Sequence, residues 1–454
     1  MFAKEVYQKR RNQLKSVIGE GIILLPGNEE SGMNFRDNTY PFRQDSCFLY
    51  FTGISRPGLC LVIDIDNDQE ILFGDEATVD DIVWTGALET LTLQAEKTGV
   101  AFTRKKVEVI NALAGNRTVH FLPVYRPETS LKLISWGLTG QPSVALIKAI
   151  VAQRSVKSEE EVKEIEKAVG ISVLMHQKAM EIARPGMTEN AVAAQLQAVA
   201  TENGGYLSFP SILTVNGEIL HNHPGNTILQ NGQMVLCDAG AENNMHYAGD
   251  LTRTFPVGHS FTTLQQEVYS IVLNAQQKAI EALKPGALFK DIHLLAAEHL
   301  VIGLTDLGLM KGDPKQAVAE DAHTLFFQCG LGHMMGLDVH DMENLGEEYV
   351  GYTDELKKSK AFGLKSLRLG KKLEQDFVVT VEPGLYFIPV LIDSWSAEKK
   401  HAEFINYEKV KQFRDFGGIR IEDDFLITAA GSRLLGPPLA KTIEEIHAIR
   451  SGLK

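Results

Sequence analysis

A ten-residue segment occurs twice in this chain, at an offset of 100 residues. Residues 177–186 and 277–286 are identical at six of ten positions, and each copy closes an apolar-periodic stretch with Pro-Gly. Such a sequence ends one helix and precedes another. The offset is too long for a solenoid, so it predicts two similar halves that face each other across one core. Independent convergence of two helix ends on Lys/Arg-Pro-Gly is the alternative.

The first third of the chain has a different pattern. Short apolar runs, as in residues 21–27 and 59–64, alternate with turn signals, which predicts strands separated by helices. The chain becomes polar near residue 155, where Ser158 and Glu161 have the spacing of a helix capping box. We therefore predict an α/β (α+β) protein with one domain of residues 1–155 and a second of residues 156–454.

Composition excludes several classes of partner. The net charge of -13 argues against nucleic acid, because phosphate binding needs a basic face. The four cysteines lack CxxC spacing, which favours a reducing compartment. No run approaches the ~18 apolar residues of a membrane span, and the first residues lack the apolar region of a signal peptide. We expect a cytoplasmic protein with no nucleic-acid or membrane partner.

Four acidic residues occur in or beside apolar strands. Asp238 and Glu382 each end a β-branched or apolar run, and Asp250 and Glu422 lie in alternating segments. An unpaired carboxylate at the end of an apolar strand is costly. Each residue alone is explained as readily by a turn or a helix cap, so the inference depends on the group.

Polar neighbours accompany these carboxylates. Strand alternation places Thr252 on the face of Asp250, and Arg420 on the face of Glu422, where it could keep a carboxylate ionised. His333 lies in the glycine-rich segment 329–341. A single histidine in such a segment is more often structural than a ligand.

Together, four carboxylates and one imidazole would repel each other in a buried pocket unless cations neutralised them. Oxygen-rich ligation with one histidine suits Mn, and also Co or Fe. Bridging carboxylates would hold two ions about 3.5–4 Å apart, an arrangement that activates a shared water for hydrolysis. The sequence thus predicts a pair of divalent metal ions held by Asp238, Asp250, His333, Glu382 and Glu422.

The segments around these residues resemble the aminopeptidase P and prolidase family, of peptidase family M24. The matching segments are LCDAG, AGDLTRTFPV, GLGHMMGLDVHD, TVEPGLYF and GGIRIEDD. The resemblance implies a pita-bread catalytic domain with an internal pseudo-twofold repeat. Residues 41–46 and 50–53 resemble the creatinase-like N-terminal domain of this family, which methionine aminopeptidases lack. Creatinase lacks the five metal ligands.

The resemblance implies hydrolysis of the Xaa-Pro bond in a proline-containing peptide, with release of the residue ahead of proline. Glu382 would be both ligand and general base, His221 and His340 would act on the substrate side, and Arg420 would lie behind the ligands. His223 is an alternative to His221. Family members are usually dimers or tetramers, which implies a homodimer or homotetramer. We expect Mn at the two metal positions, with Co, Fe or Zn as alternatives.

Other residues bear on whether the peptidase cleaves dipeptides or longer peptides. Arg368 and the insertion between Glu382 and Glu422 are similar to those of prolidases, in which an arginine holds the dipeptide carboxylate. A surface role for Arg368 is the alternative, so both Xaa-Pro dipeptidase and Xaa-Pro aminopeptidase activity stay open. Cys329 replaces a family histidine and Phe209 a tyrosine. A catalytically silent binding protein is the alternative of a different class.

Overall fold

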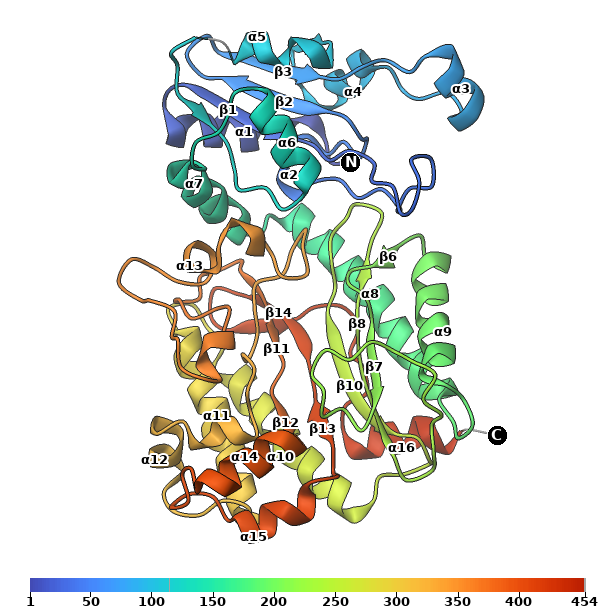
Figure 1. Ribbon diagram of the computed structural model, residues 1–454, viewed down its shortest axis with the longest axis vertical. Helices are drawn as coiled ribbons and strands as arrows, with labels where there is room; N and C mark the ends of the chain where they lie inside the picture. Colours follow the sequence, from blue (N-terminus) through green and yellow to red (C-terminus); the bar gives the residue numbers. More distant parts are fainter. Residues whose placement is uncertain (114, 453–454) are drawn as a thin grey trace. The chain divides into compact units, whose positions relative to one another are not determined.

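The chain forms two compact units in the computed structural model, which describes residues 1–113 and 115–452 (Figure 1). The N-terminal unit comprises Met1–Arg154 and the short segment Met342–Tyr349, and the C-terminal unit comprises Ser155–Asp341 and the chain from Val350 onward. The sequence had not assigned Met342–Tyr349 to the first unit. We keep the boundary between residues 155 and 156 as a proposal.

A five-stranded sheet forms the centre of the N-terminal unit, in the order β4-β3-β2-β1-β5. Its strands are β1 (Ile22–Pro26), β2 (Cys60–Asp64), β3 (Gln69–Phe73), β4 (Phe102–Arg104) and β5 (Val119–His120). Strands β1, β2 and β3 pair antiparallel, and the two edge strands pair parallel. The helices are α1 (Lys4–Ile18), α2 (Ser46–Thr52), α3 (Val79–Thr85), α4 (Leu91–Thr98), α5 (Val109–Ala112), α6 (Pro127–Ser135) and α7 (Val144–Ser155). Alternate apolar side chains of β1, β2 and β3 pack into one core cluster with α5 and α6.

Two similar halves make up the C-terminal unit, each with a pair of long helices and a three-stranded sheet. The first half has α8 (Glu159–Ile182), α9 (Glu189–Glu202) and the sheet β10-β8-β7, built from Leu251–Pro256, Met234–Ala239 and Ile212–Val215. The second half has α10 (Thr263–Ala282), α11 (Phe289–Asp306) and the sheet β11-β14-β15, built from Val378–Val381, Asp423–Ile427 and Ser432–Leu434. Figure 1 shows α9 and α11 on opposite outer sides of this unit.

Shorter elements complete the C-terminal unit. Two strand pairs are β6 (Tyr206–Leu207) with β9 (Ala241–Glu242), and β12 (Gly384–Tyr386) with β13 (Gly418–Arg420). The remaining helices are α12 (Pro314–Ala319), α13 (Glu347–Val350), α14 (Pro389–Glu398), α15 (Tyr407–Val410) and α16 (Ile443–Ser451). Single 3₁₀ turns occur at Lys106–Glu108, Ala322–Leu325, Glu343–Leu345, Leu364–Ser366 and Lys411–Phe413. Within the described ranges, no helix has the length and apolar content that a membrane crossing requires.

The repeated segment folds in the same way in both halves. Helices α8 and α10 end 100 residues apart, and α9 and α11 begin 100 residues apart. After each first helix, Gly186 and Gly286 have φ angles of 93° and 83°, which glycine adopts without the cost that a Cβ would add. Their amides donate to the carbonyls of Leu229 (2.9 Å) and Leu373 (2.8 Å). The predicted internal repeat is therefore present in the structure.

Both long first helices also begin alike. Ser158 and Glu161 form the predicted capping box at the start of α8, and Thr262 and Gln265 form the equivalent one at α10. Each box satisfies N–H groups that have no partner inside the helix.

No strand includes Glu382 or Glu422. Strand β11 ends directly before Glu382 and β12 begins directly after Pro383, because proline lacks the N–H that would continue the ladder. The alternating segment that contains Glu422 forms two strands, with a break between Arg420 and Asp423. The Glu422 amide instead donates to the Thr252 carbonyl at 3.1 Å, which joins the sheets of the two halves.

Candidate metal centre

The structure brings the five predicted ligands together where the two halves of the C-terminal unit meet. Ligand atoms of Asp250, His333 and Glu422 all lie within 4.8 Å of one another, and the three residues are buried. The Nε2 atom of His333 is 3.3 Å from Asp250 Oδ2 and 3.6 Å from Glu382 Oε1. Asp238 completes the group, because β8 and β10 place it opposite Thr252.

Each half supplies two carboxylates from comparable places. Asp238 is near the end of β8 and Asp250 directly precedes β10, whereas Glu382 follows β11 and Glu422 precedes β14. All four therefore lie where a strand begins or ends, which points side chains from both sheets into one space.

His333 is oriented by its own loop. Its Nδ1 atom lies 3.0 Å from the Met334 carbonyl, which can only accept, so Nδ1 carries the hydrogen and Nε2 presents a lone pair to the carboxylates. The backbone around His333 is fixed on β11, because its amide donates to Thr380 Oγ1 at 3.2 Å and Met334 pairs with Val379. This is the arrangement of a metal-binding imidazole.

Burial and mutual repulsion raise the pKa values of the clustered carboxyls. Burial and then the Asp238 charge raise the pKa of Asp250, and burial and then Asp250 raise that of Glu422. Burial raises the pKa of Glu382 to about 7, against the opposing charges of His333 and Arg420. Without a cation, this group of acids resists ionisation at neutral pH.

Several buried carboxylate oxygens in this group lack donors. Across the described residues, one buried oxygen each of Asp238, Asp250, Glu422 and Asp424 has no hydrogen-bond partner. Buried polar atoms without partners are rare in folded proteins and call for an ion or a water. Several carboxylate oxygens beside one neutral imidazole nitrogen fit a divalent metal.

Arg420 and Thr252 hold the outer oxygens of the carboxylates. Arg420 donates to Asp238 Oδ2 (2.6 Å), to Thr252 Oγ1 (3.3 Å) and to the Tyr386 hydroxyl (2.7 Å). Thr252 in turn donates to Glu422 Oε2 at 2.7 Å. The structure thus places both predicted supporting residues directly behind two of the candidate ligands.

Sequence reasoning missed Tyr386 and Asp424. Tyr386 supplies the tyrosine hydroxyl that Arg420 contacts, and Phe209 is only half-buried on another segment. Asp424 Oδ2 accepts the Asp250 amide at 3.1 Å, and burial raises the pKa of its carboxyl. Both residues lie inside the quoted segments TVEPGLYF and GGIRIEDD, so the signal was present but only packing shows which side chains turn inward.

The remaining predicted residues surround the centre. The ring of His340 lies 4.3 Å from that of His333, edge to face. His221 is on an exposed turn after β7; partial burial and then the Arg420 charge lower its pKa. His223 is exposed two residues further on. After burial and nearer charges, the Arg368 charge also lowers the pKa values of Asp250 and His221, so Arg368 lies within electrostatic range of both.

Cys329 lies beside the centre as an unreactive thiol. Its sulfur is 3.9 Å from the Tyr386 hydroxyl, and burial raises its pKa to about 12. A thiol needs a depressed pKa to act as a thiolate ligand or nucleophile at neutral pH. Cys329 therefore contributes a small, mainly apolar surface next to Tyr386, with which it packs.

Fold and site together define a metallopeptidase. The family model described as "Metallopeptidase family M24" matches residues 163–429, and "Aminopeptidase P, N-terminal domain" matches residues 7–118. The chain belongs to metallopeptidase family M24, in the group of aminopeptidase P and prolidase. Members of this family bind divalent metal, as the donor set of this chain requires.

Relatives match along nearly the whole chain. The human protein "Xaa-Pro dipeptidase" is 30% identical over 459 residues, covering 98% of this chain and 91% of the relative. The Escherichia coli (strain K12) protein "Xaa-Pro aminopeptidase" is 31% identical over 470 residues, covering 98% of each. The solved structure "Zn substituted E. coli Aminopeptidase P in complex with product" has a TM-score of 0.82 and 29% identity, covering 100% of this chain and 99% of the other. The predicted fold class is confirmed.

Proposed function

We propose that this chain is a divalent-metal-dependent peptidase that hydrolyses the bond between an N-terminal residue and proline. One observation carries the chemistry: carboxylates from both halves converge on His333, and one buried oxygen each of Asp238, Asp250 and Glu422 lacks a donor across the described residues. The substrate class is supported by relatives named Xaa-Pro dipeptidase and Xaa-Pro aminopeptidase.

The metal ligands are proposed to be Asp238, Asp250, His333, Glu382 and Glu422. Two divalent ions bound there would polarise the scissile carbonyl and acidify a water. Manganese is proposed as the native metal, with Co, Fe or Zn as alternatives, because oxygen-rich ligation favours hard or borderline ions.

The roles of the protein side chains follow from their positions. Glu382 accepts a proton from the attacking water and returns it to the proline nitrogen as the carbon–nitrogen bond breaks. His221 and His340 donate hydrogen bonds to the substrate carbonyl region or relay the proton. Arg420 and Thr252 keep the outer carboxylate oxygens occupied, so that the inner ones stay directed at the centre.

The experiment that tests this function starts from the full chain stripped of metal and reloaded with Mn, Co or Zn. Gly-Pro hydrolysis is expected with at least one of these ions and is expected to disappear on chelation. The absence of cleavage under all three metals would favour the alternative of a catalytically silent binding protein.

Substrate length is proposed to depend on Arg368, whose guanidinium would bind the C-terminal carboxylate of a dipeptide. Because a charge-assisted hydrogen bond contributes about 1.5–3 kcal/mol, Arg368→Ala is expected to lower kcat/KM for Ala-Pro roughly 10- to 100-fold and to spare Ala-Pro-Ala-Ala. Lys365→Ala, at an exposed lysine three residues earlier in the turn Leu364–Ser366, is the control. Faster cleavage of the tetrapeptide by the wild type, unchanged by Arg368→Ala, would instead identify an aminopeptidase.

We further propose a cytoplasmic protein that forms homodimers or homotetramers. The four cysteines, all among the described residues, form no disulfide, which fits a reducing compartment. Helix α3 has no buried residue and exposes Val79, Val83 and Trp84, the last at 87%, and Figure 1 shows it at the end of an extended loop. An apolar surface of this kind suits self-association. Sedimentation should show that Trp84→Asp dissociates the oligomer and that Val107→Asp, also exposed in this unit, does not.

A further inference from the structure

The two first helices of the repeat carry a buried polar side chain at the same repeat position. His176 on α8 and Gln276 on α10 are 100 residues apart, directly before the repeated segment, and both are fully buried. A polar group is costly in a core unless it is hydrogen-bonded. The partners of these two side chains therefore indicate what they do.

Gln276 donates from its Nε2 atom to three acceptors. These are the carbonyls of Val381 and Ile421, both at 3.3 Å, and Asp423 Oδ2 at 3.1 Å. Val381 and Ile421 directly precede the two candidate glutamate ligands. Their carbonyls lie where β11 and β13 stop, so Gln276 provides donors at a point where the strand ladders do not continue.

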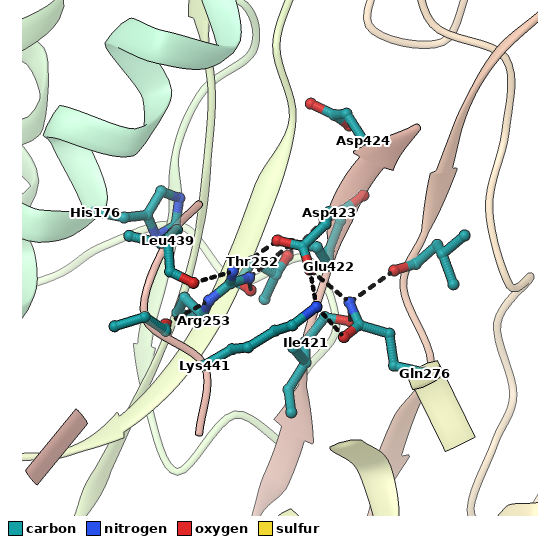
Figure 2. A network of polar contacts seen from close by, with 12 residues as sticks. His176, Thr252, Arg253, Gln276, Ile421, Glu422, Asp423, Asp424, Leu439 and Lys441 are labelled. Carbon is teal, nitrogen blue, oxygen red and sulfur yellow. Dashed lines mark hydrogen bonds and ion pairs between the residues drawn. The ribbon is translucent and has the colours of Figure 1, made fainter. Parts of the chain in front are cut away.

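The orientation of the Gln276 amide is fixed by charged neighbours. Lys441 Nζ donates to Gln276 Oε1 at 3.2 Å and to Asp423 Oδ2 at 2.8 Å. Arg253 Nη2 donates to Asp423 Oδ1 at 2.6 Å. Figure 2 shows Gln276, Lys441 and Arg253 around the Asp423 carboxylate. Because Lys441 can only donate, the amide oxygen faces it and the amide nitrogen faces the carbonyls.

His176 makes the corresponding contact in the first half. Its Nε2 atom lies 3.0 Å from the carbonyl of Ala239, directly after Asp238. The backbone of Leu251, directly after Asp250, also faces the ring. Burial lowers the pKa of His176 to about 4, so the ring is neutral and its one hydrogen lies on Nε2, toward the carbonyl.

We propose that His176 and Gln276 are an equivalent pair of positioning residues, each of which fixes the backbone beside the two carboxylate ligands of its own half. Neither side chain reaches the centre. Each side chain binds a backbone carbonyl next to a candidate ligand and so fixes the backbone there. The positions of the four carboxylates relative to one another follow from these fixed points. The inference rests on the proposed function for the identity of the ligands. Outer contacts of this kind commonly change metal affinity or activity by about 10- to 100-fold when removed.

The test is the rate at which the Mn-loaded full chain releases its metal to a chelator, measured beside kcat and KM for Gly-Pro. Gln276→Met and His176→Leu keep the volume but remove the donor. Both are expected to release Mn roughly 10- to 100-fold faster and to lower kcat more than they raise KM. His176→Gln keeps a donor at the equivalent place and is expected to retain Mn nearly as well as the wild type.

A matched control separates positioning from general loosening. Val272→Ala removes buried volume one turn earlier on α10 and leaves the carbonyl contacts intact. It is expected to lower the melting temperature without faster Mn release. Equal acceleration by Val272→Ala, or release by both donor-deleting variants within about twofold of wild type, overturns the proposal. If Gln276→Met fails to fold, Gln276→Glu decides, because it keeps the Lys441 contact and loses the Nε2 donor.

The proposed function can fail separately from this inference. A wild type that holds Mn but does not cleave Gly-Pro would contradict the proposed function, and the rates of Mn release would still test the roles of His176 and Gln276.

Discussion

At the scale of single residues, the two oxygens of one carboxylate have different surroundings. Asp238 Oδ2 accepts from Arg420 and Glu422 Oε2 from Thr252, whereas the second oxygen of each has no donor among the described residues. The outer contact fixes the rotation of the side chain, so the inner oxygen is already directed before a metal binds. This preorganisation lowers the conformational entropy that the ligand side chains lose when an ion binds.

Glu382 has the combination of properties that a catalytic base needs. Its Oε1 atom lies 3.5 Å from the Thr380 hydroxyl and 3.6 Å from His333, and burial raises its pKa to about 7, near neutral pH. Glu382→Gln is expected to lower kcat roughly 10²- to 10⁴-fold while metal stays bound, because the amide cannot accept the proton.

Metal analysis and steady-state kinetics on the same preparation check this prediction. Glu374→Gln, an exposed residue before β11, is the control and should match wild type. A Glu382→Gln variant with both ions bound and near-normal kcat would rule out this glutamate as the base.

At the scale of elements, the sequence predicted what depends on local pattern. The repeat, the capping box at Ser158 and the strand positions of the carboxylates follow from periodicity and turn residues, and the structure has them. The interruption at Glu422 could not be predicted, because its amide bonds to Thr252, 170 residues earlier in the chain. The contacts of a glutamine on an apolar helix face, such as Gln276, could not be predicted either, because the carbonyls that it binds lie more than 100 residues away in the sequence.

The repeat predicts paired responses to mutation. Gly186 and Gly286 have positive φ angles, and a Cβ at either would meet no atom within 4 Å, so alanine is penalised by backbone conformation alone. Gly186→Ala and Gly286→Ala are each expected to lower the free energy of unfolding by about 1–2 kcal/mol, and the double variant by nearly the sum.

Urea unfolding of the full chain measures these effects. Gly170→Ala is the matched control: it lies inside α8, where its Cβ would approach only Pro437 Cδ at an ordinary 3.9 Å. Alanine is the better helix former, so this variant is expected to be neutral or more stable by up to about 1 kcal/mol. Destabilisation at Gly170 equal to that at Gly186 and Gly286 would contradict the conformational explanation.

At the scale of the whole molecule, the candidate metal centre concentrates unfavourable charge in one unit. Burial raises the pKa values of Asp250, Glu382, Glu422 and Asp424 above their ordinary ranges. The repulsion among these carboxyls therefore lowers the free energy of unfolding of the metal-free chain, and binding of a cation raises it again. The stability of the C-terminal unit should depend on metal and pH together.

The sign of this dependence follows from proton binding. A carboxyl whose folded pKa is raised binds more protons in the folded state than in the unfolded state, so stability falls as pH rises between the two pKa values. For Glu382 this pH range runs from 4.5, the ordinary pKa, to about 7, the pKa in the folded chain. At 1.36 kcal/mol per pKa unit, the free energy of unfolding falls by about 3 kcal/mol across this range because of Glu382.

We therefore expect the metal-free chain to melt at a lower temperature near pH 7.5 than near pH 5.5, and Mn to raise the melting temperature more at the higher pH, where fewer protons must leave the carboxyls when the metal binds. Differential scanning calorimetry with chelator or with Mn measures both effects. Glu422→Gln, which removes one of the repelling carboxyls, should weaken the pH dependence of the metal-free chain because fewer acids compete for protons. A Mn-induced shift of equal size at both pH values would show that these carboxyls are ionised without metal, and the electrostatic account of the centre would then be wrong.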